Sequence, residues 1–178
     1  MSKRFKLYNV HKKYIRNLHN LDDNVPSVSP QIGKQNRPFL GIVVLLNGSK
    51  FCIPITSNSG EKNKKFQSMR ENITFRKIRD KDGKVLAVLN LNNMIPVQEE
   101  YITEINLKIN LQDTPEIKRW KKLCIKELNW CQSHQDEIER LANELYILYT
   151  SEKSFGKRKI CLNFPLLEKE CKKQKNIK

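Results

Sequence analysis

The sequence is poor in the residues that build metal sites, disulfide frameworks and membrane spans. Its five cysteines include no Cys-x-x-Cys pair and are odd in number, which argues against a closed disulfide framework. With only three histidines besides, no zinc-type ligand set is recognisable, and we expect no cofactor. No apolar run approaches the length of a membrane-spanning helix, and no signal-peptide core follows the polar N-terminus. We therefore expect a cytoplasmic protein whose cysteines are reduced core residues.

Acidic residues are also scarce relative to basic ones. Nineteen Asp and Glu stand against 34 Lys and Arg, which gives a formal net charge of +15. Such an excess favours a polyanionic partner, either nucleic acid or an anionic membrane surface, because self-repulsion destabilises the compact state unless a partner neutralises it. A basic protein without such a partner is the alternative. The 178 residues are enough for one domain with a real hydrophobic core.

The first two-thirds of the chain has the short alternating apolar segments and turn signals of an antiparallel sheet. A helix over Val10–Leu21 interrupts it early, with Asn9 as its N-cap and Tyr14 on its apolar face. The expected strands are Phe5–Tyr8, Phe39–Leu46, Lys50–Thr56, Ile73–Arg79, Val85–Leu91, Met94–Val97 and Ile102–Leu111. A small curled or barrel-like sheet accommodates strands of this length.

The centre of this sheet is predicted to be a long hairpin over Arg37–Ser57. Asn47-Gly48 favours a type I′ turn, which needs positive φ at both central residues. Pro54 cannot donate a ladder hydrogen bond, so the return strand must be bulged there or lie at an edge. Regular pairing then stops near Thr56, and the two hydroxyls of Thr56 and Ser57 are delivered where the sheet breaks.

A polar, basic segment follows these hydroxyls directly. Asn58–Asn72 contains Lys62, Lys64, Lys65 and Arg70 and is expected to be a mobile basic loop. Hydroxyls followed by cations indicate a phosphate partner. Each feature also has a simpler interpretation, because a strand end followed by Ser and Asn is more often just a turn, and a lysine cluster is usually a solvated charge run.

The last third of the chain has helical periodicity. Thr114 and Pro115 are an N-cap and first helical residue, and Lys118 and Lys122 fall on the polar face of the helix that they start. Ser133–Asp136 is interpreted as a capping box that opens a second helix, and a short final helix is expected over 163–171. The predicted fold is thus α+β in a single domain 1–178, with a sheet core of about 1–111 and a helical part of about 114–175.

These patterns alone predict a basic α+β protein that binds nucleic acid. Metal-independent RNA cleavage uses the neighbouring 2′-OH as nucleophile, and hydroxyl, lysine, arginine and tyrosine side chains can share the proton transfers and charge stabilisation that it needs. A non-catalytic RNA-binding module with the same basic surface is the first alternative. A DNA-binding regulator built on the C-terminal helices is the second, although no helix-turn-helix is recognisable.

Four segments in order resemble the ToxN/AbiQ family of type III toxin endoribonucleases. They are Arg37–Val43 (RPFLGIV), Pro54–Ser57 (PITS), Asn90–Val97 (NLNNMIPV) and Asn163–Lys169 (NFPLLEK), preceded by Lys13-Tyr14-Ile15. The resemblance implies a twisted barrel-like sheet similar to MazF/Kid toxins, and metal-independent cleavage that leaves 2′,3′-cyclic phosphate and 5′-hydroxyl ends. It also implies inhibition by a small repeat antitoxin RNA in a closed assembly, and a role in aborting phage infection.

The resemblance also assigns roles to individual residues. It makes Thr56 and Ser57 the catalytic hydroxyls, Tyr14 an active-site tyrosine and Arg37 a basic residue of the site. Members of the family commonly carry a lysine within two residues of the serine, whereas here Asn58–Glu61 intervene, so Lys62 is the candidate and Lys64 the next. The basic surface expected to bind RNA comprises Lys34, Lys64, Lys65, Lys118 and Lys122.

Overall fold

The computed structural model describes residues 3–26, 37–57, 62–151 and 160–173. Strands and helices follow in the order β1 (Lys6–Val10), α1 (Lys12–Leu21), β2 (Phe39–Val44), β3 (Lys50–Ser57), α2 (Lys62–Ser68), β4 (Phe75–Arg79), β5 (Val85–Asn90), β6 (Ile95–Pro96), β7 (Ile102–Glu104), α3 (Pro115–Ser133), α4 (Gln135–Thr150) and α5 (Phe164–Lys173). Two 3₁₀ turns, η2 (Leu91–Asn93) and η3 (Glu99–Tyr101), flank β6. The expected α+β class, with strands first and helices last, is confirmed.

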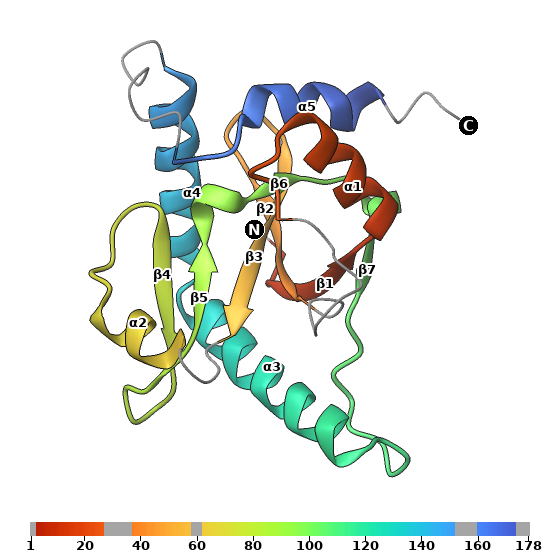
Figure 1. Cartoon of the computed structure of the whole chain (residues 1–178), viewed down its shortest axis with the longest axis vertical. Helices are drawn as coiled ribbons and strands as arrows, with labels where there is room; N and C mark the ends of the chain where they lie inside the picture. The colour runs from red at the N-terminus through yellow and green to blue at the C-terminus, as the bar shows by residue number, and fades with distance from the viewer. Residues whose placement is uncertain (1–2, 27–36, 58–61, 152–159, 174–178) are drawn as a thin grey trace.

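The strands form one antiparallel sheet in the order β4-β5-β3-β2-β1-β7, with β6 paired to β3 beside this path (Figure 1). The path has two ends, β4 and β7, and in the described part of the chain no pairing joins them. The barrel-like closure expected from the sequence is therefore not confirmed. The long β3 is the centre of the sheet, because it pairs with β2, β5 and β6.

The predicted central hairpin forms, but its turn differs in type. Leu45 N–H donates to the carbonyl of Ser49 at 2.9 Å, and Gly48 N–H donates back to the carbonyl of Leu45 at 2.8 Å. The loop therefore has three residues, with Gly48 at φ 81° in the left-handed region that glycine tolerates. The two-residue type I′ turn was wrong because Leu46, which is 84% exposed, belongs to the loop rather than to the strand.

The bulge or sheet edge predicted at Pro54 was wrong, because Pro54 is paired in regular register in the interior of the sheet. Its missing N–H is accommodated by a change of partner strand. It stands opposite Phe39 of β2, and the next residue, Ile55, donates to the carbonyl of Pro38 at 3.0 Å. Pro54 is thus at a position that makes no hydrogen bond to β2. On the other side of β3, pairing with β6 ends at Cys52 and pairing with β5 begins at Ile55. The one irregularity of the β2–β3 pairing lies at Leu40–Val43 instead.

The helices pack around the sheet in two groups (Figure 1). Helix α3 crosses the end of the sheet where β3 finishes, and α4 continues from it beside β4 and β5. Helices α1 and α5 lie together at the opposite end. One continuous hydrophobic core joins the sheet to α1, α3, α4 and α5, and all five cysteines are buried and free in it, as expected.

Several boundaries differ from the sequence prediction. Strand β1 continues to Val10, so α1 begins at Lys12 with His11 as its N-cap in place of Asn9. The segment expected as a loop over 58–72 contains α2, which the sequence conceals because Phe66 is its only apolar residue. The expected strand Ile102–Leu111 is much shorter in the structure: β7 ends at Glu104, and one further backbone hydrogen bond to β1 runs from Ile105 N–H to the Leu7 carbonyl at 2.8 Å.

The caps of the C-terminal helices give one success and one failure of the sequence reasoning. Thr114 caps α3 as predicted, since its Oγ1 accepts a hydrogen bond from Ile117 N–H at 3.3 Å. The capping box at Ser133 was wrong: His134 is the N-cap of α4, and the Ser133 hydroxyl donates to the carbonyl of Trp130 at 2.8 Å.

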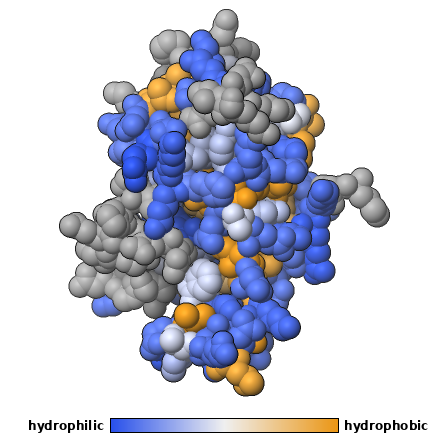
Figure 2. Space-filling model, turned by 90° about the vertical axis from the view of Figure 1, so that its right-hand side faces the viewer, coloured by the Kyte–Doolittle hydropathy of each residue, from blue (hydrophilic) through white to orange (hydrophobic). Residues whose placement is uncertain are grey.

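The surface seen in Figure 2 is mostly hydrophilic, with hydrophobic residues in scattered patches. Among the described helices, none combines the length and apolar character that crossing a membrane requires.

Candidate active site at the end of strand β3

The two hydroxyls proposed for chemistry stand on opposite faces of the sheet. Thr56 and Ser57 are the last residues of β3, both half-buried, and neighbouring residues of a strand point to opposite sides. The Thr56 hydroxyl accepts a hydrogen bond from Asn90 Nδ2 of β5 at 3.0 Å. The Ser57 hydroxyl donates to Glu127 Oε1 of α3 at 3.0 Å. Each hydroxyl therefore has its own set of neighbours.

Thr56 shares its face of the sheet with cationic side chains. The hydrogen bond from Ile55 N–H to the Pro38 carbonyl extends the β2–β3 register, and one further residue along it places Arg37 opposite Thr56. Arg37 is half-buried, and burial lowers its guanidinium pKa from the ordinary value. Thr56 also stands in one row with Val88 of β5 and Lys77 of β4.

Lys77 is a buried lysine beneath α2. Its side chain is 5% exposed, and its Nζ donates to the carbonyl of Gln67 in α2 at 2.9 Å. The backbone N–H of Lys77 donates to Glu71 Oε1 at 2.6 Å. These contacts hold α2 over the Thr56 face of the sheet, and α2 carries Lys64 and Lys65, both exposed.

Ser57 faces the interior between the sheet and α3. Its strand partner is Ala87 of β5, which in turn faces Ile78 of β4, and both are 0% exposed. Glu127 is also 0% exposed, and burial raises the pKa of its carboxyl to about 7, while the hydrogen bond from Ser57 acts in the opposite direction. The carboxyl therefore keeps its proton to a higher pH than an ordinary glutamate does.

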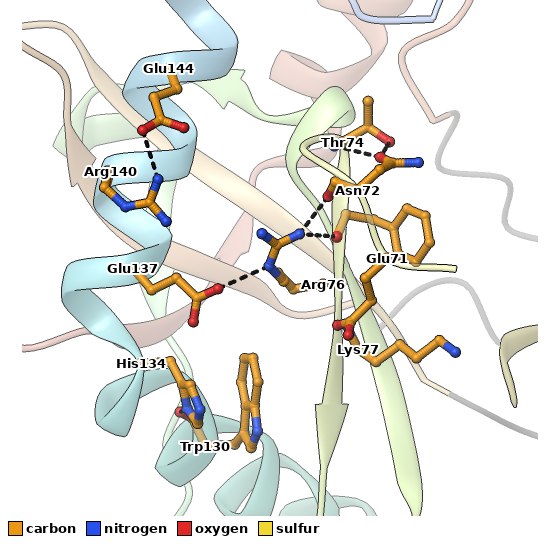
Figure 3. A network of polar contacts seen from close by, with 11 residues as sticks. Glu71, Asn72, Thr74, Arg76, Lys77, Trp130, His134, Glu137, Arg140 and Glu144 are labelled. Atoms are coloured by element: carbon orange, nitrogen blue, oxygen red, sulfur yellow. Dashed lines mark hydrogen bonds and ion pairs between the residues drawn. The ribbon is translucent and has the colours of Figure 1, made fainter. Parts of the chain in front are cut away.

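A neighbouring ion pair fixes β4 to α4 on this same face (Figure 3). Arg76 Nε donates to Glu137 Oε1 at 3.0 Å, and Arg76 Nη1 donates to the carbonyls of Asn72 and Phe75. At the junction of α3 and α4 the Trp130 and His134 rings stack with centroids 3.9 Å apart. The ion pair thus joins β4 to α4, and the stacked rings lie at the junction of α3 and α4.

Tyr14 lies elsewhere in the molecule. It is 2% exposed, its hydroxyl donates to the carbonyl of Pro96 at 2.7 Å, and its ring stacks on Tyr101 with centroids 4.3 Å apart. Pro96 pairs with Phe51 of β3, six residues before Ser57, which corresponds to roughly 20 Å of strand. Burial raises the Tyr14 pKa far above the ordinary value. The structure thus places Thr56, Ser57 and Arg37 at one end of the sheet, with Thr56 and Arg37 on one face and Ser57 on the other, and it does not bring Tyr14 to them.

The lysines expected to bind RNA fall into separate groups. Lys64 and Lys65 are on α2, and the backbone of Lys62 starts that helix. Lys122 is exposed on α3, and Lys118 donates to the carbonyl of Leu111 at 3.4 Å. In Figure 1 the end of β3 lies beside the second half of α3, whereas the first half, which carries Lys118 and Lys122, runs away from β3. Lys34 lies outside the described residues.

Sequence reasoning missed Asn90, Lys77 and Glu127. A signal existed for Glu127, because it falls on the apolar side of a helix between Cys124 and Cys131, three residues after one and four before the other. Asn90 and Lys77 look like ordinary polar positions of alternating strands and carry no such signal. Within the part of the chain that the structure describes, no three His, Cys, Asp or Glu side chains converge as a metal-binding group.

Two known proteins are similar to nearly the whole chain. Endoribonuclease ToxN of Bacillus thuringiensis subsp. kurstaki is 27% identical over 175 residues, which cover 96% of this chain and 84% of that protein. Endoribonuclease ToxN of Pectobacterium atrosepticum is 28% identical over 165 residues, covering 93% of this chain and 91% of the relative.

Solved structures share the fold. A structure described in a study of type III toxin–antitoxin systems, with "selective toxin inhibition by a non-coding RNA pseudoknot", superposes with a TM-score of 0.79 at 26% identity, over 98% of this chain and 99% of that one. AbiQ, a lactococcal anti-phage endoribonuclease, superposes with a TM-score of 0.77 over 97% of this chain and 99% of its own, and at 22% identity this likeness concerns the fold.

The family model described as "Toxin ToxN, type III toxin-antitoxin system" matches residues 6–172. The fold defines the class of the protein: it is an α+β protein with a seven-stranded antiparallel sheet and a basic composition. The chain belongs to the ToxN/AbiQ family of type III toxin–antitoxin endoribonucleases.

Proposed function

We propose that this single-domain chain is the toxin of a type III system that limits phage infection, acting in the cytoplasm as a metal-independent endoribonuclease. The observation that carries this proposal is that Thr56 and Ser57 are consecutive residues at the end of β3, with Arg37 opposite Thr56 and a helix with exposed lysines over that face. Hydroxyls and cations in that grouping are the groups that transfer of a phosphodiester to its own 2′-OH requires.

The roles follow from what each side chain offers. The substrate is proposed to pass over the end of β3, where the two faces of the sheet meet. Ser57 then contacts the attacking 2′-OH from one face, while Thr56, held by Asn90, and Arg37 contact the non-bridging oxygens of the phosphate from the other, where negative charge grows. Lys62, or Lys64 beside it, supplies a proton to the departing 5′-oxygen. Only the family resemblance supports a catalytic role for Tyr14. Its side chain is buried and donates to the Pro96 carbonyl, which favours a structural role.

The partner in the inactive state is proposed to be a small repeat antitoxin RNA in a closed assembly with the toxin. The net charge of +15 supports this, because phosphate contacts from many cations dominate such binding. One related structure is described as showing inhibition by a non-coding RNA pseudoknot, and another as an antiviral system regulated by a processed non-coding RNA.

The test is cleavage of end-labelled RNA by the purified protein in excess chelator. We expect discrete cuts with 2′,3′-cyclic phosphate and 5′-hydroxyl ends, and unchanged rates when the chelator is raised tenfold. Tight binding of the same RNA without cleavage would contradict the proposal and favour the alternative, a non-catalytic RNA-binding module. Products with 3′-hydroxyl ends would contradict the proposed chemistry.

A further inference from the structure

The carboxyl of Glu127 is the least satisfied polar group in the described interior. It lies in the middle of α3 with a fully buried side chain. Oε1 accepts the Ser57 hydrogen bond, whereas Oε2 accepts none within the part of the chain that the structure describes. Burial of a carboxyl with one partner opposes folding. Buried ionisable groups that destabilise the fold in this way are concentrated at functional sites.

The other buried glutamate shows what a structural carboxylate looks like in this protein. Glu168 is 7% exposed and accepts hydrogen bonds from Ser49 Oγ, from Asn47 Nδ2 at 3.4 Å and from Tyr146 Oη at 2.6 Å. Both of its oxygens are used, and its three donors join the β2–β3 turn to α4 and α5. In the described part of the chain, Glu127 instead accepts a hydrogen bond from one side chain, the hydroxyl of Ser57.

In the part of the chain that the structure describes, no charge lies close enough to Glu127 to hold its carboxyl ionised. On its own helix the titratable neighbours are the thiols of Cys124 and Cys131, whose pKa values are raised mainly by burial. Strand β5 carries no charged residue. The charged groups of the other packed elements have partners of their own: Arg76 of β4 pairs with Glu137 of α4, Lys77 donates to Gln67, Arg79 donates to Gly83, and Lys6 of β1 pairs with Glu104.

We propose that Glu127 is a positioning residue for Ser57, which holds the serine hydroxyl in one orientation and receives its proton during RNA cleavage. This inference rests on the proposed function. Because Ser57 donates its only proton to Glu127, its oxygen faces the substrate as an acceptor for the 2′-OH. The pair then acts as a hydroxyl with its own base, an arrangement that activates weak nucleophiles in other enzymes.

The proton balance of the step is closed. The 2′-OH proton passes to Ser57 Oγ while the Ser57 proton passes to the ionised carboxylate of Glu127. The 2′-oxygen forms its bond to phosphorus, the bond between phosphorus and the 5′-oxygen breaks, and that oxygen takes a proton from a lysine ammonium or from water. The products are a 2′,3′-cyclic phosphate and a 5′-hydroxyl. Glu127 afterwards returns its proton through Ser57 to solvent.

This role predicts a particular pH profile. With a pKa of about 7, Glu127 is protonated in mildly acidic solution and cannot accept a proton. The single-turnover cleavage rate of the parent should therefore rise between pH 5.5 and 7, by about tenfold per unit well below the pKa, and level off above it. Glu127→Gln keeps the size of the side chain and an oxygen for the Ser57 hydrogen bond, but it cannot accept a proton.

The experiment compares single-turnover cleavage from pH 5.5 to 9 for the parent, Glu127→Gln and the matched control Glu168→Gln, with RNA affinity and melting temperature measured in parallel. We expect Glu127→Gln to lose roughly 10²-fold in rate at pH 8 and to lose the rise near pH 7, with unchanged RNA affinity. Glu168→Gln should keep the parental profile in its folded fraction.

Two outcomes would overturn the role of Glu127. One is a Glu127→Gln variant with parental rates at pH 8. The other is a parental profile that is flat between pH 5.5 and 8, which decides against the proposal even if the variant does not fold. A parent that fails to cleave RNA at any pH overturns the proposed function itself, and so differs from both.

Discussion

The hydroxyl of Tyr14 donates a 2.7 Å hydrogen bond to the carbonyl of Pro96, so this tyrosine fastens α1 to β6 rather than facing solvent. We expect Tyr14→Phe to lower the free energy of unfolding by about 1 to 2 kcal/mol, because it leaves a buried carbonyl without its donor. The cleavage rate of the folded variant should equal that of the parent. Urea unfolding and single-turnover cleavage measure the two effects, and a large loss of cleavage without loss of stability would restore Tyr14 to the catalytic site.

The turn of the central hairpin depends on Glu168. Glu168→Ala removes the acceptor for Ser49, Asn47 and Tyr146 and leaves the half-buried hydroxyls of Ser49 and Tyr146 without it. We expect a loss of about 2 to 3 kcal/mol in the free energy of unfolding. Lys169→Ala, an exposed neighbour on α5, is the control and should stay within about 0.5 kcal/mol of the parent. Equal midpoints in urea for the two variants would show that the Glu168 contacts contribute little.

The exposed lysines of α2 should contribute to RNA affinity and not to stability. For the double variant Lys64→Ala and Lys65→Ala we expect the slope of log affinity against log salt to fall by about 1 to 2, because two phosphate contacts are lost. Lys12→Ala with Lys13→Ala, also exposed but on α1 at the other end of the sheet, is the matched control. An identical loss in both double variants would mean that the effect comes from net charge and not from a site near β3.

The stability of the fold should depend on pH through Glu127. Its folded pKa of about 7 is above the ordinary 4.5, so between these values the unfolded chain is ionised while the folded protein still holds the proton. This group therefore makes stability fall as pH rises from about 4.5 to about 7, by on the order of 3 kcal/mol in total. Glu127→Gln should raise the melting temperature more at pH 8 than at pH 5. A difference that is the same at both pH values would place the pKa of Glu127 near its ordinary value.

The sequence predicted most of the β2–β3 hairpin because its signals are local. Apolar alternation, the glycine after Asn47 and the proline in the return strand act over a few residues. The Thr114 cap of α3 was predictable for the same reason, since it is decided within one turn of the helix. Helix α2 was missed because it has one apolar residue and no amphipathic stripe, so its position depends on tertiary contacts such as Lys77 with Gln67.

The candidate site was predictable only in part. The pattern and the family resemblance singled out Thr56 and Ser57, but they could not show that the two hydroxyls face opposite sides of the sheet with different partners. Glu127 and Ser57 are 70 residues apart, and their contact depends on how α3 crosses the sheet. A contact of this kind leaves only a weak trace in the sequence, a single acid on an apolar helix face.

The Ser57–Glu127 contact also changes what we expect of Ser57→Ala. From the sequence, a hydroxyl at the start of a polar loop should be dispensable for stability, within about 1 kcal/mol. The structure shows instead that its removal takes the one donor from a buried carboxyl, so we expect a cost of about 1 to 3 kcal/mol. A urea titration at pH 6, where the carboxyl is mostly protonated, measures this cost directly. A loss below about 0.5 kcal/mol would show that the hydrogen bond contributes little to folding.

The single-turnover rate of RNA cleavage by Ser57→Ala, measured in excess chelator and corrected for the folded fraction, tests the proposed site most directly. We expect the rate to fall by roughly 10²-fold or more, as for loss of one preorganised group in a transition state, while affinity for antitoxin RNA is retained. Ser68→Ala, which alters an exposed hydroxyl at the end of α2, is the control and should cleave like the parent. Cleavage by Ser57→Ala within a few-fold of the parental rate would contradict the assignment of catalysis to the end of β3.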